Sequence, residues 1–217
     1  MTKKSDVAKL VQEISSREKC LCILVNNAGI DSASVTTESS SAQEMKQNLF
    51  DTEKTTLADW TNTYATNVAS TFFMTTAFLP LLQVSTERHA WWSGTAINTS
   101  SISGLVKSAQ HHFSYNASKA AAIHLTRMLA AEIAENGLKI RVNSIAPGVF
   151  PSEMAAGESD EFQKSHVSSE KYKEKFAAGR PGKDVDMAQA VLVFAANQYL
   201  NGQTLAVDGG YTLSAGL

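Results

Sequence analysis

The sequence predicts an α/β fold, a parallel sheet with helices on both faces, folded as one domain over residues 1–217. Three observations predict it. Segments with apolar residues at helical spacing alternate with short apolar runs of strand length. The run from Leu21 to Val25 is apolar throughout, as expected for a strand buried on both faces. Turn residues such as Asn136-Gly137 and Pro147-Gly148 then mark where elements end.

The first half of the chain predicts helices on either side of that strand. Ser5–Arg17 has an amphipathic period near 3.6, and Ser5 is its expected N-cap. The polar segment 31–56 is interpreted as a surface loop with a short helix at 44–50, and a disordered linker is the alternative. A long helix is expected over 57–83, with Pro80 marking a kink or stop near its end.

The second half continues the alternation. Helices are expected over 115–135, where Asn-Gly follows as a stop signal, and over 185–197. Between these two helices lies a mostly polar segment, 147–182, which is interpreted as a lid. The remaining strands are expected at 96–99, 140–146 and 203–207. Strands that alternate with helices in this way form a parallel sheet.

Composition limits the classes of function. Apolar residues make up 43% of the chain and charged residues 18%, as in soluble globular proteins. A net charge of -2 gives no electrostatic reason to expect nucleic acid or a membrane surface as partner. No run approaches the roughly 18 apolar residues of a membrane span, and the N-terminal lysines lack the apolar core of a secretory signal. We expect a cytoplasmic protein, with a biosynthetic compartment as the alternative.

The two cysteines predict neither a disulfide nor a metal site. Cys20 and Cys22 are two residues apart, so on an extended strand they point to the same face and cannot join. Further ligands at metal-binding spacing are missing from the sequence, and we expect no bound metal. Both are interpreted as buried or half-buried thiols.

The stretch Tyr115-Asn-Ala-Ser-Lys119 carries the strongest chemical signal. Residues at i and i+4 share one face of a helix, so the ammonium group would lie near the phenol. A nearby positive charge favours phenolate and would lower the pKa of Tyr115. A tyrosine tuned in this way can exchange protons near neutral pH, as an acid/base catalyst must.

Further motifs accompany this pair in a fixed order along the chain. They are Val25-Asn-Asn-Ala-Gly29, Asn67 within Tyr-Ala-Thr-Asn-Val-Ala-Ser70, Ile97-Asn-Thr-Ser-Ser-Ile-Ser-Gly104, Arg141-Val-Asn-Ser-Ile-Ala-Pro-Gly148 and Asn201-Gly-Gln-Thr-Leu-Ala-Val-Asp-Gly-Gly210. The ordered set resembles the short-chain dehydrogenase/reductase family over nearly the whole chain. The segment from Ser144 to Met154 is similar to a fungal branch of 3-oxoacyl-carrier-protein-reductase-like proteins.

The resemblance implies a catalytic set and a reaction, the reversible transfer of a hydride between a nicotinamide cofactor and a carbonyl or alcohol. Tyr115 would be the general acid/base, and Lys119 would lower its pKa and hold the cofactor ribose. Ser101 would hydrogen-bond the substrate carbonyl, with Ser100 and Ser103 as competing candidates.

Asn67 would support a water chain that reaches the lysine. The resemblance also implies residues that lie beside the cofactor, NADP or NAD: Asn26, Ala28, Gly29, Tyr115, Lys119, Pro147, Gly148, Phe150 and Ser152. For Asn26, Ala28 and Gly29, a purely structural role is the alternative. His111 and His112 are expected to be partly exposed loop residues that could touch substrate.

One family motif has no counterpart in this sequence. Such families begin with a strand, a glycine-rich turn and a helix that cradle the pyrophosphate, and no glycine-rich turn precedes Asn26. The resemblance therefore implies a Rossmann-like sheet without its first three strands, and we expect NADPH to bind weakly. Calorimetric titration tests this, since a dissociation constant in the low micromolar range or tighter would contradict it. Two alternatives are a cofactor-independent acid/base catalyst (isomerase, lyase or cyclase) and an inactive truncated homologue.

The sequence also predicts self-association. The helix that starts at Tyr115 carries too many apolar residues for one buried stripe, and in the family it forms a dimer contact with the helix through Asn67. Without preceding strands, Leu21 to Val25 would be an apolar sheet edge, which favours pairing. We expect a homodimer or larger homo-oligomer that acts on a small-molecule carbonyl or alcohol.

Overall fold

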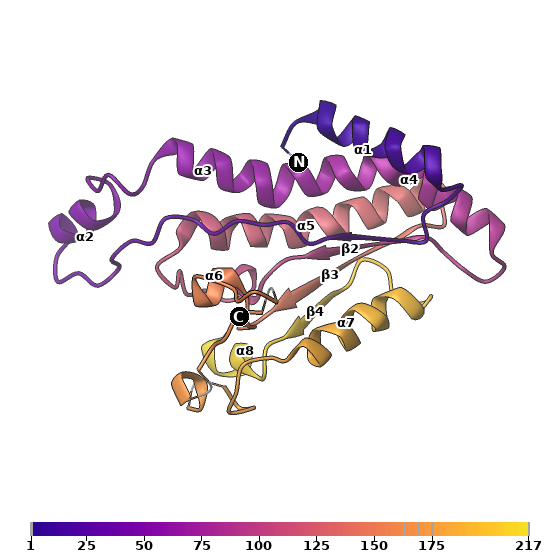
Figure 1. The fold of residues 1–217 in the computed structure, drawn as a ribbon. Coiled ribbons are helices and arrows are strands. Elements are labelled where there is room, and N and C mark those ends of the chain that lie inside the picture. Colours follow the sequence, from indigo (N-terminus) through magenta and orange to yellow (C-terminus); the bar gives the residue numbers. More distant parts are fainter. Residues whose placement is uncertain (1, 163, 169, 175, 217) are drawn as a thin grey trace.

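Four parallel strands form one sheet with helices stacked against its two faces (Figure 1). The computed structural model describes residues 2–162, 164–168, 170–174 and 176–216. The strands lie side by side in chain order: β1 (Ile23–Asn26), β2 (Thr95–Thr99), β3 (Arg141–Pro147) and β4 (Thr204–Val207). Each neighbouring pair is parallel, so every connection crosses a face of the sheet. The predicted α/β fold is confirmed.

One face of the sheet is covered by three helices. These are α1 (Lys4–Arg17), α4 (Ser70–Arg88) and α5 (Phe113–Glu135). Phe78 and Leu82 of α4 meet Leu129 of α5 in a core that includes the strand residues Leu24, Ala96 and Val142. The predicted stop of α5 at Asn136-Gly137 is confirmed, since Gly137 adopts φ +75°.

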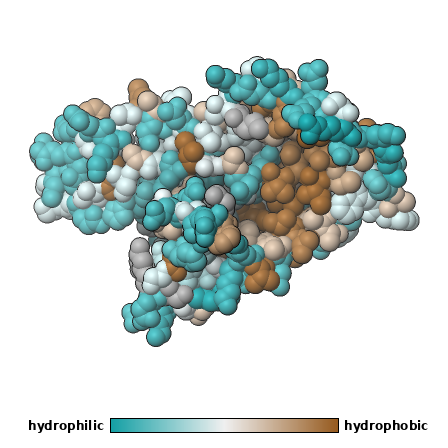
Figure 2. Space-filling model, in the orientation of Figure 1, coloured by the Kyte–Doolittle hydropathy of each residue, from teal (hydrophilic) through white to brown (hydrophobic). Residues whose placement is uncertain are grey.

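The opposite face is covered over only part of its width. Helix α7 (Asp184–Ala196) packs on β2, β3 and β4, where Phe194 meets Ile97 and Ile145. It makes no comparable contact with β1, so Ile23 and Val25 remain 37% and 45% exposed. Figure 2 shows a broad apolar patch in this region, beneath α1. The prediction that the first strand is buried on both faces is therefore wrong.

The long helix after residue 56 differs from its prediction in two ways. It consists of α3 (Leu57–Tyr64), a π-helical turn (Ala65–Ala69) and α4, which runs past Pro80 to Arg88. Pro80 is exposed, and the helix continues because buried Phe78 and Leu82 on either side anchor it to the sheet. The expected stop at Pro80 is wrong. Thr56 does cap α3, accepting a hydrogen bond from Asp59 N at 3.0 Å.

The same stretch is the one that could be taken for a membrane-spanning helix. By length and composition, Leu57–Arg88 is apolar enough to cross a membrane, although no such segment was expected. Thr75, Phe78 and Leu82 of α4 are buried inside the protein, and a core helix of a soluble protein passes the same test. The packing of α4 against α1 and the sheet accounts for its apolar residues.

Several smaller elements complete the description. The interpretation of 31–56 as a loop with a local helix is confirmed, because α2 (Ala42–Leu49) lies within it. Helix α1 begins at Lys4 with Lys3 at its N-cap, so Ser5 is not the cap. The segment 147–182 contains α6 (Glu153–Ala156) and a 3₁₀ turn (Glu170–Tyr172). A last short helix, α8 (Tyr211–Ala215), was not predicted. Both cysteines are free and half-buried, as expected.

Candidate active site

The predicted site residues gather around one cleft at the carboxyl ends of β1, β2 and β3. Loops that follow parallel strands emerge at the same edge of the sheet, which is where ligands bind in open α/β folds. The cleft encloses about 860 Å³. Nine predicted residues line it: Ala28, Gly29, Ser101, Tyr115, Lys119, Pro147, Gly148, Phe150 and Ser152. Asn26 and Asn67 are not among its lining residues.

Lys119 is the most unusual charged group of the site. Its side chain lies one helical turn after Tyr115 on α5 and is 4% exposed. The ammonium donates to the carbonyl of Thr99 at 3.1 Å and lies 5.5 Å from the centre of the Tyr115 ring. Burial lowers the pKa of Lys119 to about 8, because a desolvated ammonium is disfavoured. A buried lysine poised near neutral pH is typical of a functional site.

The pKa of Tyr115 moves in the direction opposite to the prediction. Burial raises it, hydrogen bonding with Ser101 lowers it, and the negative charge of Asp31 raises it again. Lys119 lies over the ring and donates a hydrogen bond to the carbonyl oxygen of Thr99, and burial disfavours its own charged form. The prediction that the pKa of Tyr115 is lowered is therefore wrong for this structure. Tyr115 is held as the protonated phenol, the form that can donate a proton.

The structure separates Ser101 from its two neighbours. The hydroxyl of Ser100 is buried, donates to Ile145 O at 2.8 Å and accepts from Ser144 Oγ at 2.7 Å. Ser103 Oγ donates to Gln110 at 2.8 Å. Ser101 Oγ lines the cleft, accepts from Ser103 N at 3.1 Å and hydrogen-bonds Tyr115. Of the three, only Ser101 faces both the cleft and the tyrosine.

Asn67 acts on the loop after β1. It lies in the π-helical turn and is 3% exposed. Its side-chain amide makes two hydrogen bonds with the backbone of Ile30, accepting from the N–H at 2.9 Å and donating to the carbonyl at 3.0 Å. It also donates to Ser118 Oγ at 3.0 Å. A Cβ on Gly29 would lie 3.3 Å from Asn67 Oδ1 and 3.2 Å from Lys119 Nζ. Asn67 and Lys119 therefore meet across a position that only glycine fits easily.

Among the residues after β1, Asn27 lines the cleft and Asn26 does not. Asn26 Nδ2 donates to Thr75 Oγ1 at 3.0 Å and to Asn98 Oδ1 at 2.8 Å, which ties β1 to α4 and β2. Asn26 thus has the structural role that the sequence left open. At the carboxyl edge of the sheet, Asn27 Oδ1 accepts a hydrogen bond from Thr99 Oγ1 at 3.1 Å. Strand alternation separates the two asparagines, since successive side chains point to opposite faces.

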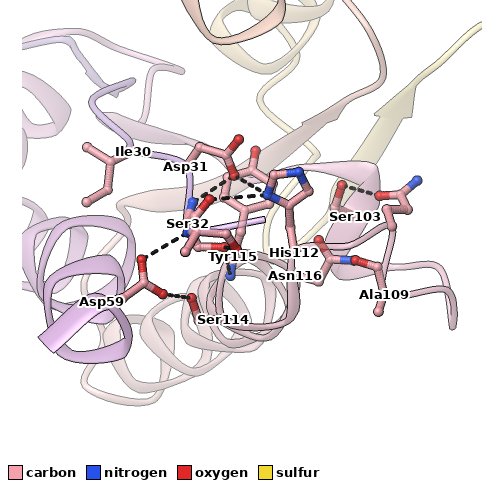
Figure 3. A network of polar contacts seen from close by, with 12 residues as sticks. Ile30, Asp31, Ser32, Asp59, Ser103, Ala109, His112, Ser114, Tyr115 and Asn116 are labelled. Atoms are coloured by element: carbon pink, nitrogen blue, oxygen red, sulfur yellow. Dashed lines mark hydrogen bonds and ion pairs between the residues drawn. The ribbon is translucent and has the colours of Figure 1, made fainter. Parts of the chain in front are cut away.

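The loop 30–33 fixes the first turn of α5 (Figure 3). Ser32 Oγ accepts from Tyr115 N at 3.3 Å. Asp59 of α3 accepts from Ala33 N at 3.0 Å and from Ser114 Oγ at 2.9 Å. These contacts orient the backbone that carries Tyr115. Sequence reasoning missed them because the partners are between 26 and 83 residues apart.

Both histidines before Tyr115 contact the segment 31–37 that follows β1. His112 Nδ1 lies 3.1 Å from Asp31 Oδ1 (Figure 3), and His111 Nδ1 lies 3.1 Å from both Thr37 Oγ1 and the carbonyl of Val35. His111 is exposed and lines the cleft, whereas His112 is half-buried. The interpretation as partly exposed loop histidines is confirmed.

The loop after β3 passes close to β4 and supplies Pro147, Gly148, Phe150 and Ser152 to the lining of the cleft. Gly148 passes so close to β4 that a Cβ there would lie 2.8 Å from Asp208 Cα. The Phe150 ring packs against Gly182, and Ser152 Oγ caps α6 by accepting from Ala155 N at 3.3 Å. Among the residues that the structure describes, Thr99 O is the one acceptor hydrogen-bonded to the Lys119 ammonium, which leaves donors for hydroxyl groups. Within the described part of the chain, no cluster of His, Cys, Asp or Glu could hold a metal ion.

Gly104→Ala should destabilise the fold, because the turn after Ser101 packs directly on α5. A Cβ at this position would lie 2.5 Å from Ala120 N and 2.5 Å from the carbonyl carbon of Lys119. Helix backbone cannot yield, so we expect a loss of about 1–3 kcal/mol in the free energy of unfolding, measured by urea denaturation. Gly29→Ala is the matched control, since its Cβ meets only side-chain tips and should cost less. A Gly104→Ala protein as stable as the parent would contradict the packing described.

A half-buried tyrosine beside a buried lysine, with a cleft-facing serine, lies at the carboxyl edge of a Rossmann-like parallel sheet, as in oxidoreductases of the nicotinamide-dependent α/β class. The comparisons with known proteins agree. A family model described as enoyl-(acyl carrier protein) reductase matches residues 1–212. The chain belongs to the short-chain dehydrogenase/reductase family.

Relatives in sequence and structure cover nearly the whole chain. It is 34% identical over 213 residues to the short-chain dehydrogenase/reductase PhomF of Diaporthe leptostromiformis, covering 95% of this chain and 70% of the relative. It is 32% identical over 207 residues to the 3-oxoacyl-[acyl-carrier-protein] reductase FabG of Staphylococcus aureus, covering 94% and 72%. The solved complex of RhlG with NADP from Pseudomonas aeruginosa superposes with a TM-score of 0.76 at 29% identity, covering 97% and 73%.

Proposed function

We propose that this protein is an NADP-dependent oxidoreductase that interconverts a small-molecule carbonyl compound and its alcohol. The observation that carries the proposal is the meeting of Ser101, Tyr115 and Lys119 in one cleft of about 860 Å³. The family membership supports hydride-transfer chemistry over a cofactor-independent isomerase, lyase or cyclase.

Each residue has a role that its surroundings support. Ser101 donates a hydrogen bond from its hydroxyl to the carbonyl oxygen of the substrate and polarises the carbonyl. Tyr115, held as a phenol by burial, delivers the proton that completes the alcohol. Lys119 holds ribose hydroxyls and stabilises the phenolate that remains. When bound, the nicotinamide supplies or accepts the hydride.

NADP is proposed over NAD on the basis of relatives. Solved neighbours include ElxO with NADP bound, at a TM-score of 0.74, and an NADPH-dependent 3-quinuclidinone reductase from Rhodotorula rubra, at 0.72. These share 28% and 26% of their sequence with this chain and match 75% and 69% of their own lengths. Pro147, Gly148, Phe150 and Ser152 are proposed to lie beside the nicotinamide, with Ala28 and Gly29 across the cleft.

The direct test is turnover of a ketone panel by the purified protein with NADPH or NADH, followed by the absorbance of the reduced nicotinamide. We expect oxidation of NADPH that depends on ketone, at a higher rate than with NADH. The same panel without nicotinamide should give no product. Product formed without nicotinamide would overturn the proposal in favour of cofactor-independent acid/base chemistry.

We also propose a cytoplasmic homodimer, and the structure offers two candidate surfaces for it. One is the edge of β1, where Val25 is 45% exposed, and the other is the outer face of α4 and α5, where Phe72 and Met128 are 40% and 51% exposed. Much of the apolar surface of α5 is buried within the chain, which weakens the helix argument made from sequence and favours the edge.

Light scattering should give a mass above one chain. Val25→Lys should lower it if the β1 edge pairs, and Met128→Lys should lower it if the helices do. Leu57→Lys is the control, since that side chain is 88% exposed and belongs to neither surface. A monodisperse wild-type monomer at micromolar concentration would contradict the homodimer.

A further inference from the structure

An aromatic wall closes the cleft on the side formed by the chain's C-terminal part. Tyr172 and Phe176 stack with ring centres 5.3 Å apart and planes 3° from parallel. The Tyr211 ring meets Phe176 edge-on, with centres 5.6 Å apart at 79°. All three residues line the same cleft as Ser101 and Tyr115. Phe176 is only 6% exposed, so the half-buried rings of Tyr172 and Tyr211 present most of the wall to a ligand ring.

A chain of hydrogen bonds ties this wall to the reacting centre. Tyr211 OH accepts from Gln110 Nε2 at 3.0 Å, and Gln110 Oε1 accepts from Ser103 Oγ at 2.8 Å. The backbone N–H of Ser103 donates to Ser101 Oγ at 3.1 Å. Gln110 thus bridges α8 and the turn that carries the catalytic serine. It does so from a left-handed backbone conformation, φ 51°, which is uncommon for a residue with a side chain.

Few of the residues that line the cleft carry a charged side chain. Among the described lining residues, Lys119 and Glu153 are the ones with an ionised side chain at neutral pH, histidine aside. Lys119 belongs to the reacting centre, and Glu153 is exposed at the start of α6. The part of a substrate that reaches past Ser101 to the wall therefore meets rings and uncharged groups.

We infer that the cleft takes an uncharged ketone with an aromatic ring, and that Gln110 is a positioning residue that sets the wall's distance from Ser101. The inference rests on the proposed function and names its substrate class. A ring stacked on the wall gains about 0.5–1.5 kcal/mol beyond the area it buries, which a saturated ring of the same size does not gain. Without Gln110 the Tyr211 ring loses its tie to the Ser101 turn.

The test compares 4-phenyl-2-butanone with 4-cyclohexyl-2-butanone, whose carbonyl groups are equally reactive because neither is conjugated to its ring. With NADPH, wild-type kcat/KM should favour the phenyl compound by about 3- to 10-fold. Gln110→Ala and Tyr211→Phe should each reduce that preference, chiefly by raising KM for the phenyl compound. The double variant should lose little more than either single one, because both break the same bridge. Gln47→Ala, on exposed α2, is the matched control and should keep the wild-type preference.

Equal use of the two ketones by the wild type would overturn the substrate class, and an unchanged preference in Gln110→Ala would overturn the role of Gln110. Failure of the proposed function looks different, because no ketone is then reduced at all. In that case binding of the two ketones to the cofactor-free protein, measured by ligand-observed NMR, still decides the inference. Tighter binding of the phenyl compound that is lost in Gln110→Ala supports it, and equal binding overturns it.

Discussion

Tyr115→Phe should abolish nearly all carbonyl reduction and leave the fold intact. The change removes one oxygen from a ring whose burial and packing stay the same. That hydroxyl hydrogen-bonds Ser101 in the cleft, and burial keeps it protonated. Loss of a positioned general acid costs about 10²–10⁴-fold in rate. The measurement is kcat with NADPH and a ketone, together with circular dichroism to verify the fold.

Tyr199→Phe is the matched control, because this side chain is 98% exposed and removing its hydroxyl should change neither rate nor fold. Binding of NADPH to Tyr115→Phe should stay close to that of the parent, since the nicotinamide contacts proposed lie on the loop after β3. A Tyr115→Phe protein with activity within threefold of the parent would show that another group donates the proton.

Lys119→Met should have two opposite effects, a large loss of activity and a gain in stability at neutral pH. Removing a preorganised positive group from a reacting centre typically costs about 10²–10³-fold. The ammonium is 4% exposed, and its folded-state pKa of about 8 lies below the usual value of 10.5. Folding therefore carries the full penalty of burying the charge below pH 8, and methionine of similar length avoids it.

The sign of the pH dependence follows from the same shift. Between about pH 8 and 10.5 the unfolded chain binds more protons at Lys119 than the folded one, so the stability of the parent rises with pH in that window. The stability advantage of Lys119→Met should be largest near pH 7 and shrink above pH 8. Turnover by the parent should fall above about pH 8 as Lys119 loses its charge.

Melting temperatures at several pH values and a pH–rate profile measure these effects. Lys9→Met, on the exposed side of α1, is the control and should show neither the activity loss nor the pH-dependent stability. If Lys119→Met melts below the parent at pH 7, its contacts with Thr99 and Tyr115 outweigh the burial penalty, and the stability part of the prediction is wrong.

The proposed catalytic pair could be predicted from the sequence because its geometry is local. Tyr115 and Lys119 are four residues apart, and any helix places them on one face. The α/β class follows equally from local periods of two and 3.6 residues. The direction of the tyrosine's pKa was predicted wrongly, because it depends on burial and on Asp31, which comes from a distant loop.

What the sequence determined by itself was the order of helices and strands, the parallel sheet and the placement of Tyr115 and Lys119 one turn apart on a helix, since each depends on neighbours along the chain. Only the tertiary structure decided among Ser100, Ser101 and Ser103, moved the cleft contact from Asn26 to Asn27, left one face of β1 open and brought Gln110 to Tyr211. Gln110 and Tyr211 are a hundred and one residues apart. Contacts of that range depend on how completed elements pack, and no local period of the sequence encodes them.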